Sequence, residues 1–136
     1  MSRRQTRSEA RERAFSLIFQ LATKDIEPEF LIEHMLEEYP ESVTNLAYIK
    51  ETVYGVQQNR ASLAEKIAAV LPENRGVERL SKAVYTILLL AVYEIESVSD
   101  VPEKVAVNEA VELAKKYAEE DAAPFVNGVL SGILKR

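Results

Sequence analysis

The sequence contains no cysteine and only one histidine, His34. Without cysteine there is neither a disulfide framework nor a thiolate metal site, and a single imidazole cannot form a histidine-based metal cluster or relay. His34 lies in a helical pattern of polar and apolar residues, which predicts an ordinary surface or boundary position. A Gly-rich cofactor loop is also missing. These absences argue against a metalloenzyme or a cofactor-dependent enzyme, and we expect no cofactor.

Long hydrophobic runs are absent too. The longest uncharged apolar stretch, AVYTILLLAVY at residues 83–93, is well short of the roughly 18 residues that a membrane span needs. The chain does not open on a charged and then apolar leader that would indicate secretion. We therefore expect a cytoplasmic protein that does not enter a membrane.

The charge is unevenly placed along the chain. The net charge is −5, yet residues 1–13 hold five arginines against two glutamates, so the remaining residues carry −8. A short basic arm, predicted at residues 1–8, on an acidic body indicates an anionic partner. Arginine supplies forked, counterion-releasing phosphate contacts. The alternative is that these arginines only form a solvated first helical turn.

Apolar residues recur at helical spacing almost everywhere, and no stretch alternates with period two. Thr6 and Glu9 have the spacing of a capping box that starts a helix, and Pro28 and Pro40 bracket a second one. Further helices are predicted after Ser42, at residues 62–71, after Ser81, over residues 107–120 and after Asp121, with ENRG at residues 73–76 as a loop. The prediction is a single all-α domain over residues 1–136, with about seven helices.

The pattern also predicts which faces of two helices are buried. The helix after Ser81 is apolar nearly all round, which predicts that it is the most buried. The next helix is expected to bury one stripe and to carry a Glu112–Lys116 surface pair. The residues of that stripe are Val107, Ala110, Val111, Ala114 and Tyr117.

The stretch DAAPFVNGVLSGIL at residues 121–134 contains Asn127-Gly128, a strong hairpin signal inside an otherwise helical pattern. Asp121 is a good N-cap residue, so we predict a helix here and not a turn. On a helical wheel Gly128, Gly132 and Phe125 gather beside the core stripe. They make either a strip for close helix packing or a flat docking surface with an exposed ring.

Three segments carry a resemblance to a known family. SDVPEKVAVNEAVELAKKYAEEDAAPFVNGVL, LAVYEI before it and RRQTRSEARERAFSLIFQL at the start are similar, in the same order, to the NusB family of bacterial transcription antitermination factors. The resemblance implies two helical bundles, pairing with the small-subunit ribosomal protein NusE, and binding of the single-stranded boxA element of nascent ribosomal RNA. It implies action in an RNA polymerase antitermination complex, without catalysis.

The resemblance also implies which residues act. RNA contacts fall on Arg3, Arg4, Arg7, Arg11, Asp121 and Phe125. The side facing NusE is implied to include Phe19 and the helix after Ser81, where Val84, Tyr85 and Leu89 stand at positions that often carry charge in relatives. We expect a more apolar partner contact in consequence.

Two other readings remain open from the sequence. The extra apolar surface on the helix after Ser81 could be buried in a homodimer. NusB-like domains also occur at the start of ribosomal RNA cytosine methyltransferases, although the lack of a cysteine nucleophile and the end of the sequence at Arg136 argue against an active one.

Overall fold

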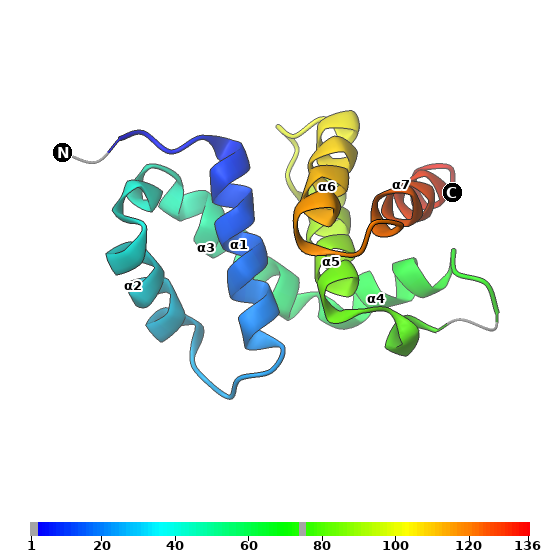
Figure 1. Ribbon diagram of the computed structural model, residues 1–136, viewed down its shortest axis with the longest axis horizontal. Helices are drawn as coiled ribbons and strands as arrows, with labels where there is room; N and C mark the ends of the chain where they lie inside the picture. Colours follow the sequence, from blue (N-terminus) through cyan, green and yellow to red (C-terminus); the bar gives the residue numbers. More distant parts are fainter. Residues whose placement is uncertain (1–2, 74–75) are drawn as a thin grey trace. The chain divides into compact units, whose positions relative to one another are not determined.

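The protein is all-helical in the computed structural model, which describes residues 3–73 and 76–136 (Figure 1). The helices are α1 Arg7–Leu21, α2 Pro28–Glu38, η1 Pro40–Asn45, α3 Leu46–Gln58, α4 Arg60–Ala68, η2 Val77–Arg79, α5 Lys82–Ser97, α6 Glu103–Tyr117 and α7 Ala122–Leu134. The predicted all-α class is confirmed. No helix in the described ranges is long and apolar enough to cross a membrane.

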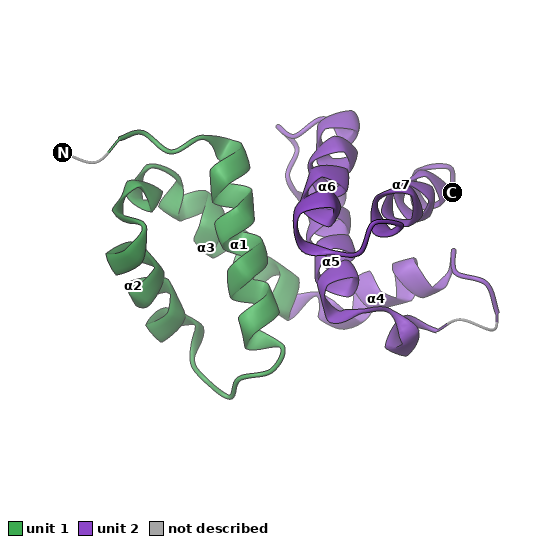
Figure 2. Cartoon of the chain, viewed as in Figure 1, with its two compact units in different colours: residues 1–57 green, residues 58–136 purple. Residues whose placement is uncertain are grey.

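The chain divides into two compact units, residues 1–57 and 58–136 (Figure 2). In the first unit α1 packs on α2 and on η1, and α2 packs on η1. In the second unit α5 packs on α4, α6 and α7, and α6 packs on α7. The two predicted bundles therefore correspond to these units.

The start of α1 follows the predicted capping box. The Thr6 hydroxyl accepts a hydrogen bond from the Glu9 backbone N–H at 3.1 Å, and the Glu9 carboxylate accepts from the Thr6 N–H at 2.9 Å. Ala10, Ala14 and Ile18 on the inner face of α1 are fully buried. Two orphan donors of the first turn are thus satisfied reciprocally, which fixes where the arginine-bearing segment enters the helix.

The segment after Ser42 differs from the predicted single helix. Residues Pro40–Asn45 form the 3-10 helix η1, and the α-helix α3 begins only at Leu46. Ser42 is fully buried and its hydroxyl is bonded to the Gln5 side chain. This short tighter turn places polar side chains of η1 against the start of the chain.

The prediction for α5 is confirmed. Residues 87–92 are at most 3% exposed, and Val84, Thr86, Tyr93 and Glu94 are buried as well. Ser81 caps the helix by accepting from the Val84 N–H at 3.2 Å. Because α5 is apolar on all sides, exposing any of its faces to water would be unfavourable, and the helix lies in the core of its unit.

The predicted stripe of α6 is rotated. Ala110 and Ala114 are buried as expected, but the other buried positions are Ala106 and Leu113, while Tyr117 is 40% exposed. Helix α6 must face both α5 and α7, and the small alanine side chains permit close approach on that side. The surface pair also differs, because Glu112 pairs with Lys115 at 3.7 Å.

Candidate nucleic-acid interface

The residues predicted to contact RNA fall in both units, and each group is described within its own unit. The arginines belong to the first unit, and Asp121 and Phe125 belong to the second.

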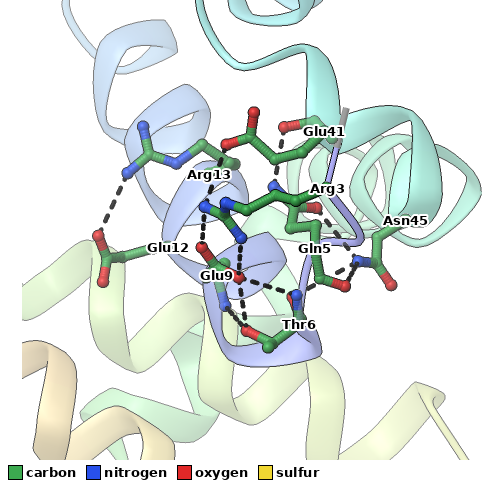
Figure 3. A network of polar contacts seen from close by, with 9 residues as sticks. Arg3, Gln5, Thr6, Glu9, Glu12, Arg13, Glu41 and Asn45 are labelled. Atoms are coloured by element: carbon green, nitrogen blue, oxygen red, sulfur yellow. Dashed lines mark hydrogen bonds and ion pairs between the residues drawn. The ribbon is translucent and has the colours of Figure 1, made fainter. Parts of the chain in front are cut away.

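The start of the chain is fastened to η1 through Gln5. The Gln5 side chain is 4% exposed, and its amide nitrogen donates to the Ser42 hydroxyl at 2.9 Å. The Asn45 amide donates in turn to the Gln5 carbonyl and to Gln5 Oε1, both at 3.1 Å (Figure 3). Residues 3–6 therefore do not project as a separate arm, and the predicted arm at residues 1–8 is partly built into the unit. Residues 1–2 lie outside the described chain.

Arg3 is held by carboxylates (Figure 3). Its guanidinium makes a forked contact with Glu9, at 2.9 and 2.5 Å, and reaches Glu41 at 3.5 Å. The hydrogen bond from Arg3, followed by the one from the Thr6 N–H, lowers the pKa of Glu9 from 4.5 to about 2. Arg3 still leaves 59% of its side chain exposed. The charge of Arg3 is thus partly neutralised by Glu9 and Glu41 in the free protein.

Arg7 is oriented by an aromatic ring. Its guanidinium lies 4.3 Å from the centroid of Tyr48, and its Nε donates to Asn45 Oδ1 at 3.3 Å. The Tyr48 ring is buried, whereas Arg7 is exposed. A cation–π contact combined with a hydrogen bond at Nε leaves the two terminal nitrogens as a fork directed away from that bond. This geometry suits bidentate contact with a phosphate.

Arg11 does not belong to the exposed set. It is 4% exposed and lies over the same Tyr48 ring, at 5.8 Å. Position 11 lies one helical turn after Arg7, and its side chain is buried where that of Arg7 is exposed. The expectation that Arg11 contacts RNA does not fit this conformation. Arg4 is exposed, as predicted.

In the second unit a shallow pocket of about 530 Å³ opens at the start of α7. Its lining combines one basic, two acidic and several apolar side chains, namely Arg79, Leu80, Ser81, Val84, Glu119, Asp121, Ala122 and Phe125. Phe125 is half-buried there, so part of its ring faces the pocket. Because its charge is mixed, this pocket is a poorer phosphate site than the arginine segment, which consists of Arg3, Arg4 and Arg7. It is better suited to a base.

Helix α7 is regular through Asn127-Gly128, so the predicted helix is confirmed. Asp121 stands at the N-cap, but its side chain makes no capping bond because its backbone is already in the helical region, at φ −87° and ψ −1°. A Cβ at Gly128 would meet nothing within 4 Å, while one at Gly132 would lie 3.5 Å from Val70. Tight helix packing on the glycine strip is therefore wrong for Gly128, which is exposed.

The residues expected to face NusE differ in accessibility. Phe19 is half-buried, with its ring 5.9 Å from that of Phe15. Tyr85 is half-buried beneath Arg60, whose guanidinium lies 5.8 Å from the ring. Val84 is 5% exposed and Leu89 is fully buried. Leu89 is part of the core of α5 and cannot contact a partner in this conformation.

Sequence reasoning missed three contributors to the interface. Tyr48 and Asn45, far along the chain, orient Arg7, and Arg79 lines the pocket beside Phe125. Tyr48 precedes Ile49, an apolar residue that is fully buried, so its place beside that apolar position was the available signal. Nothing local in the sequence points from Arg79 to Phe125.

Comparisons with known proteins agree with this picture. The model of the NusB family matches residues 8–135. A transcription antitermination protein NusB from Pediococcus pentosaceus is 42% identical, over 95% of this chain and 97% of that protein. Solved NusB from T. maritima superposes with a TM-score of 0.86 at 30% identity, over 98% of this chain and 94% of that one. A structure of the antitermination factors NusB and NusE with double-stranded RNA gives 0.83 at 28% identity, over 95% and 96%.

The helical fold and the exposed arginines are those of a small nucleic-acid-binding protein. Within that class the chain belongs to the NusB family, whose members are transcription antitermination factors. The family resemblance of the three sequence segments is thus confirmed over nearly the whole chain.

Proposed function

We propose that this protein is an RNA-binding antitermination factor that pairs with NusE and binds the boxA element of nascent ribosomal RNA. The observation that carries the proposal is the likeness, over 95% of the chain, to NusB in a complex with NusE and RNA. Action within an RNA polymerase antitermination complex, in the cytoplasm, follows from the same assignment.

The RNA side begins at the arginine segment. Arg4 and Arg7 are exposed, and Arg3 keeps 59% of its side chain exposed despite its carboxylate partners. These side chains supply phosphate contacts that position the RNA without reading its sequence. Because Tyr48 and Asn45 hold Arg7 in place, less conformational entropy is lost when it binds.

The second contact is the pocket at the start of α7. The half-buried ring of Phe125 offers a face on which an unstacked base can stack, and Asp121 offers acceptor oxygens to base amino groups or a 2′-hydroxyl. Arg79 supplies the cation at this pocket. Base recognition is thus assigned to unit 2 and phosphate binding mainly to unit 1.

For NusE the accessible candidates are Phe19 and Tyr85, which are half-buried, whereas Val84 is only 5% exposed. Half-buried aromatic rings supply large contact area at low entropic cost. Leu89 is withdrawn because it is fully buried. A homodimer through the apolar surface of α5 is disfavoured on the same ground, since residues 87–92 are at most 3% exposed in the single chain.

The test is binding of a boxA-containing RNA oligonucleotide to the full chain, with and without NusE, across a salt series. We expect RNA binding that NusE strengthens, and a preference for boxA over a scrambled oligonucleotide of equal length. Light scattering of the protein alone, at several concentrations, gives its oligomeric state. Equal binding to both oligonucleotides, unaffected by NusE, would contradict the proposal.

A further inference from the structure

The acidic excess of the protein is concentrated in one short region. Between Lys24 and Lys50 the sequence has seven acidic residues and no lysine or arginine. These residues are Asp25, Glu27, Glu29, Glu33, Glu37, Glu38 and Glu41. They account for −7 of the −8 carried outside residues 1–13. Most of the acidic body is thus α2 and its flanks.

Helix α2 also exposes an aromatic ring. Its inner face buries Leu31, Ile32 and Met35, and Phe30 points to the other side with 64% of its surface exposed. Ile26, just before the helix, is 42% exposed. Leaving a phenylalanine this exposed forgoes most of the stabilisation that its burial would provide.

Phe30 shares its face with two of the acids. At 100° per residue, Glu33 and Glu37 fall within about 60° of Phe30 on the helical wheel, at spacings i+3 and i+7. Both carboxylates are exposed, and neither forms an ion pair within the described part of the chain. By contrast, Glu29 accepts from the Tyr54 hydroxyl at 2.5 Å and Glu41 faces Arg3.

We propose that this face of α2, made by Phe30, Glu33 and Glu37 with Ile26 beside it, docks a basic amphipathic helix of a protein partner. The acidic side chains repel nucleic acid, so they exclude RNA as the occupant. A helix with lysine or arginine flanking apolar residues matches both features, because its charges meet the carboxylates while its apolar side chains cover the ring. The proposal is independent of the RNA-binding function, which uses other surfaces.

The experiment uses full-length protein labelled with ¹⁵N and a synthetic peptide of Lys and Leu in amphipathic helical order. A second peptide has the same composition in a scrambled order that destroys amphipathicity. We expect chemical-shift changes centred on residues 26–37 with the first peptide, and much weaker binding of the second. Phe30→Ala should weaken binding about tenfold or more, because the loss of one buried large side chain has that effect. The double variant Glu33→Gln, Glu37→Gln should make binding of the first peptide less dependent on salt concentration.

Val43→Ala is the matched control, because Val43 is also 64% exposed but lies on η1. It should leave peptide binding unchanged. Equal binding of both peptides with no effect of Phe30→Ala would reduce the interaction to bulk charge attraction and overturn the proposal. So would the absence of binding at millimolar peptide. Self-association of the protein that Phe30→Ala abolishes would identify a second copy as the occupant, and would overturn it as well.

Discussion

At the scale of single residues, the contact between Arg7 and Tyr48 has the clearest consequence for RNA binding. The buried ring lies 4.3 Å from the guanidinium, and such contacts contribute about 0.5–1 kcal/mol at exposed sites. Tyr48→Leu should therefore weaken RNA binding about two- to fivefold, whereas Tyr48→Phe, which keeps the ring, should restore it. The same Leu substitution should have no further effect in an Arg7→Ala background. A double-mutant cycle on RNA affinity measures this coupling, and additive losses would rule out a positioning role.

The lowered pKa of Glu9 predicts how the stability of the fold depends on pH. Its pKa in the folded protein, about 2, lies below the ordinary value of 4.5 because Arg3 and the Thr6 N–H bond to the ionised carboxylate. The native state therefore binds fewer protons than the unfolded chain over this interval, and the stabilisation is present above about pH 4.5 and lost as the pH falls toward 2. Glu9→Gln should reduce the melting temperature at pH 7 and converge with the wild type near pH 2. Melts at a series of pH values test this, and a constant difference would contradict it.

Phe125 is half-buried, so its two possible roles can be separated by experiment. If a base stacks on its exposed part, Phe125→Ala should cost about 1–3 kcal/mol of RNA affinity and leave the salt slope unchanged. If the ring is mainly a packing residue, the change should instead cost about 3–5 kcal/mol of folding stability. A thermal melt beside the RNA titration decides between them. Loss of stability with full RNA affinity in the folded fraction would exclude stacking.

At the scale of helices, Gly128 and Gly132 in α7 are costly residues without a steric reason to be glycine. A Cβ at Gly128 meets open space, and one at Gly132 makes ordinary contact with Val70 at 3.5 Å. Because glycine in a helix costs about 0.5–1 kcal/mol relative to alanine, Gly128→Ala should stabilise the protein by about that amount. Chemical denaturation measures the gain. A stabilised variant that binds RNA less well would show that RNA approaches the helix at this glycine, and unchanged binding would place RNA elsewhere.

Local signals predicted the helices well where a side chain fixes an end. The Thr6–Glu9 capping box and the prolines around α2 act within a few residues, so they can be recognised from the sequence alone. The face that α6 buries is set by its neighbours α5 and α7, and was therefore predicted only in part: Ala110 and Ala114 are buried, whereas Tyr117 is exposed. The Asp121 cap failed for a local reason, because the backbone there is already helical and the side chain cannot reach back.

At the scale of the whole molecule, the charge asymmetry was predictable because it needs only the order of residues. What each arginine does was not, because it depends on contacts with residues more than thirty positions away. Arg3 meets Glu41, Arg7 meets Asn45 and Tyr48, and Arg11 meets the same ring from the buried side. Composition alone does not distinguish these three arginines, because each carries the same positive charge. The fold distributes them between a carboxylate pair, an oriented fork and the interior.

That distribution changes the expected salt dependence of RNA binding. Each phosphate contact to single-stranded RNA contributes about −0.7 to the slope of log K against log salt, so four arginines would give roughly −3. With Arg11 4% exposed, the structure leaves Arg3, Arg4 and Arg7, and the slope of the segment should be near −2.

Single alanine variants test this division. Arg4→Ala and Arg7→Ala should each flatten the slope by about 0.7 and weaken binding to every RNA sequence alike. Arg3→Ala should have a smaller effect, because Glu9 and Glu41 already offset its charge. Arg11→Ala should lower thermal stability and leave the slope unchanged. If Arg11→Ala flattens the slope as much as Arg7→Ala does, then Arg11 must leave the Tyr48 ring when RNA binds, and the buried position is only that of the free protein.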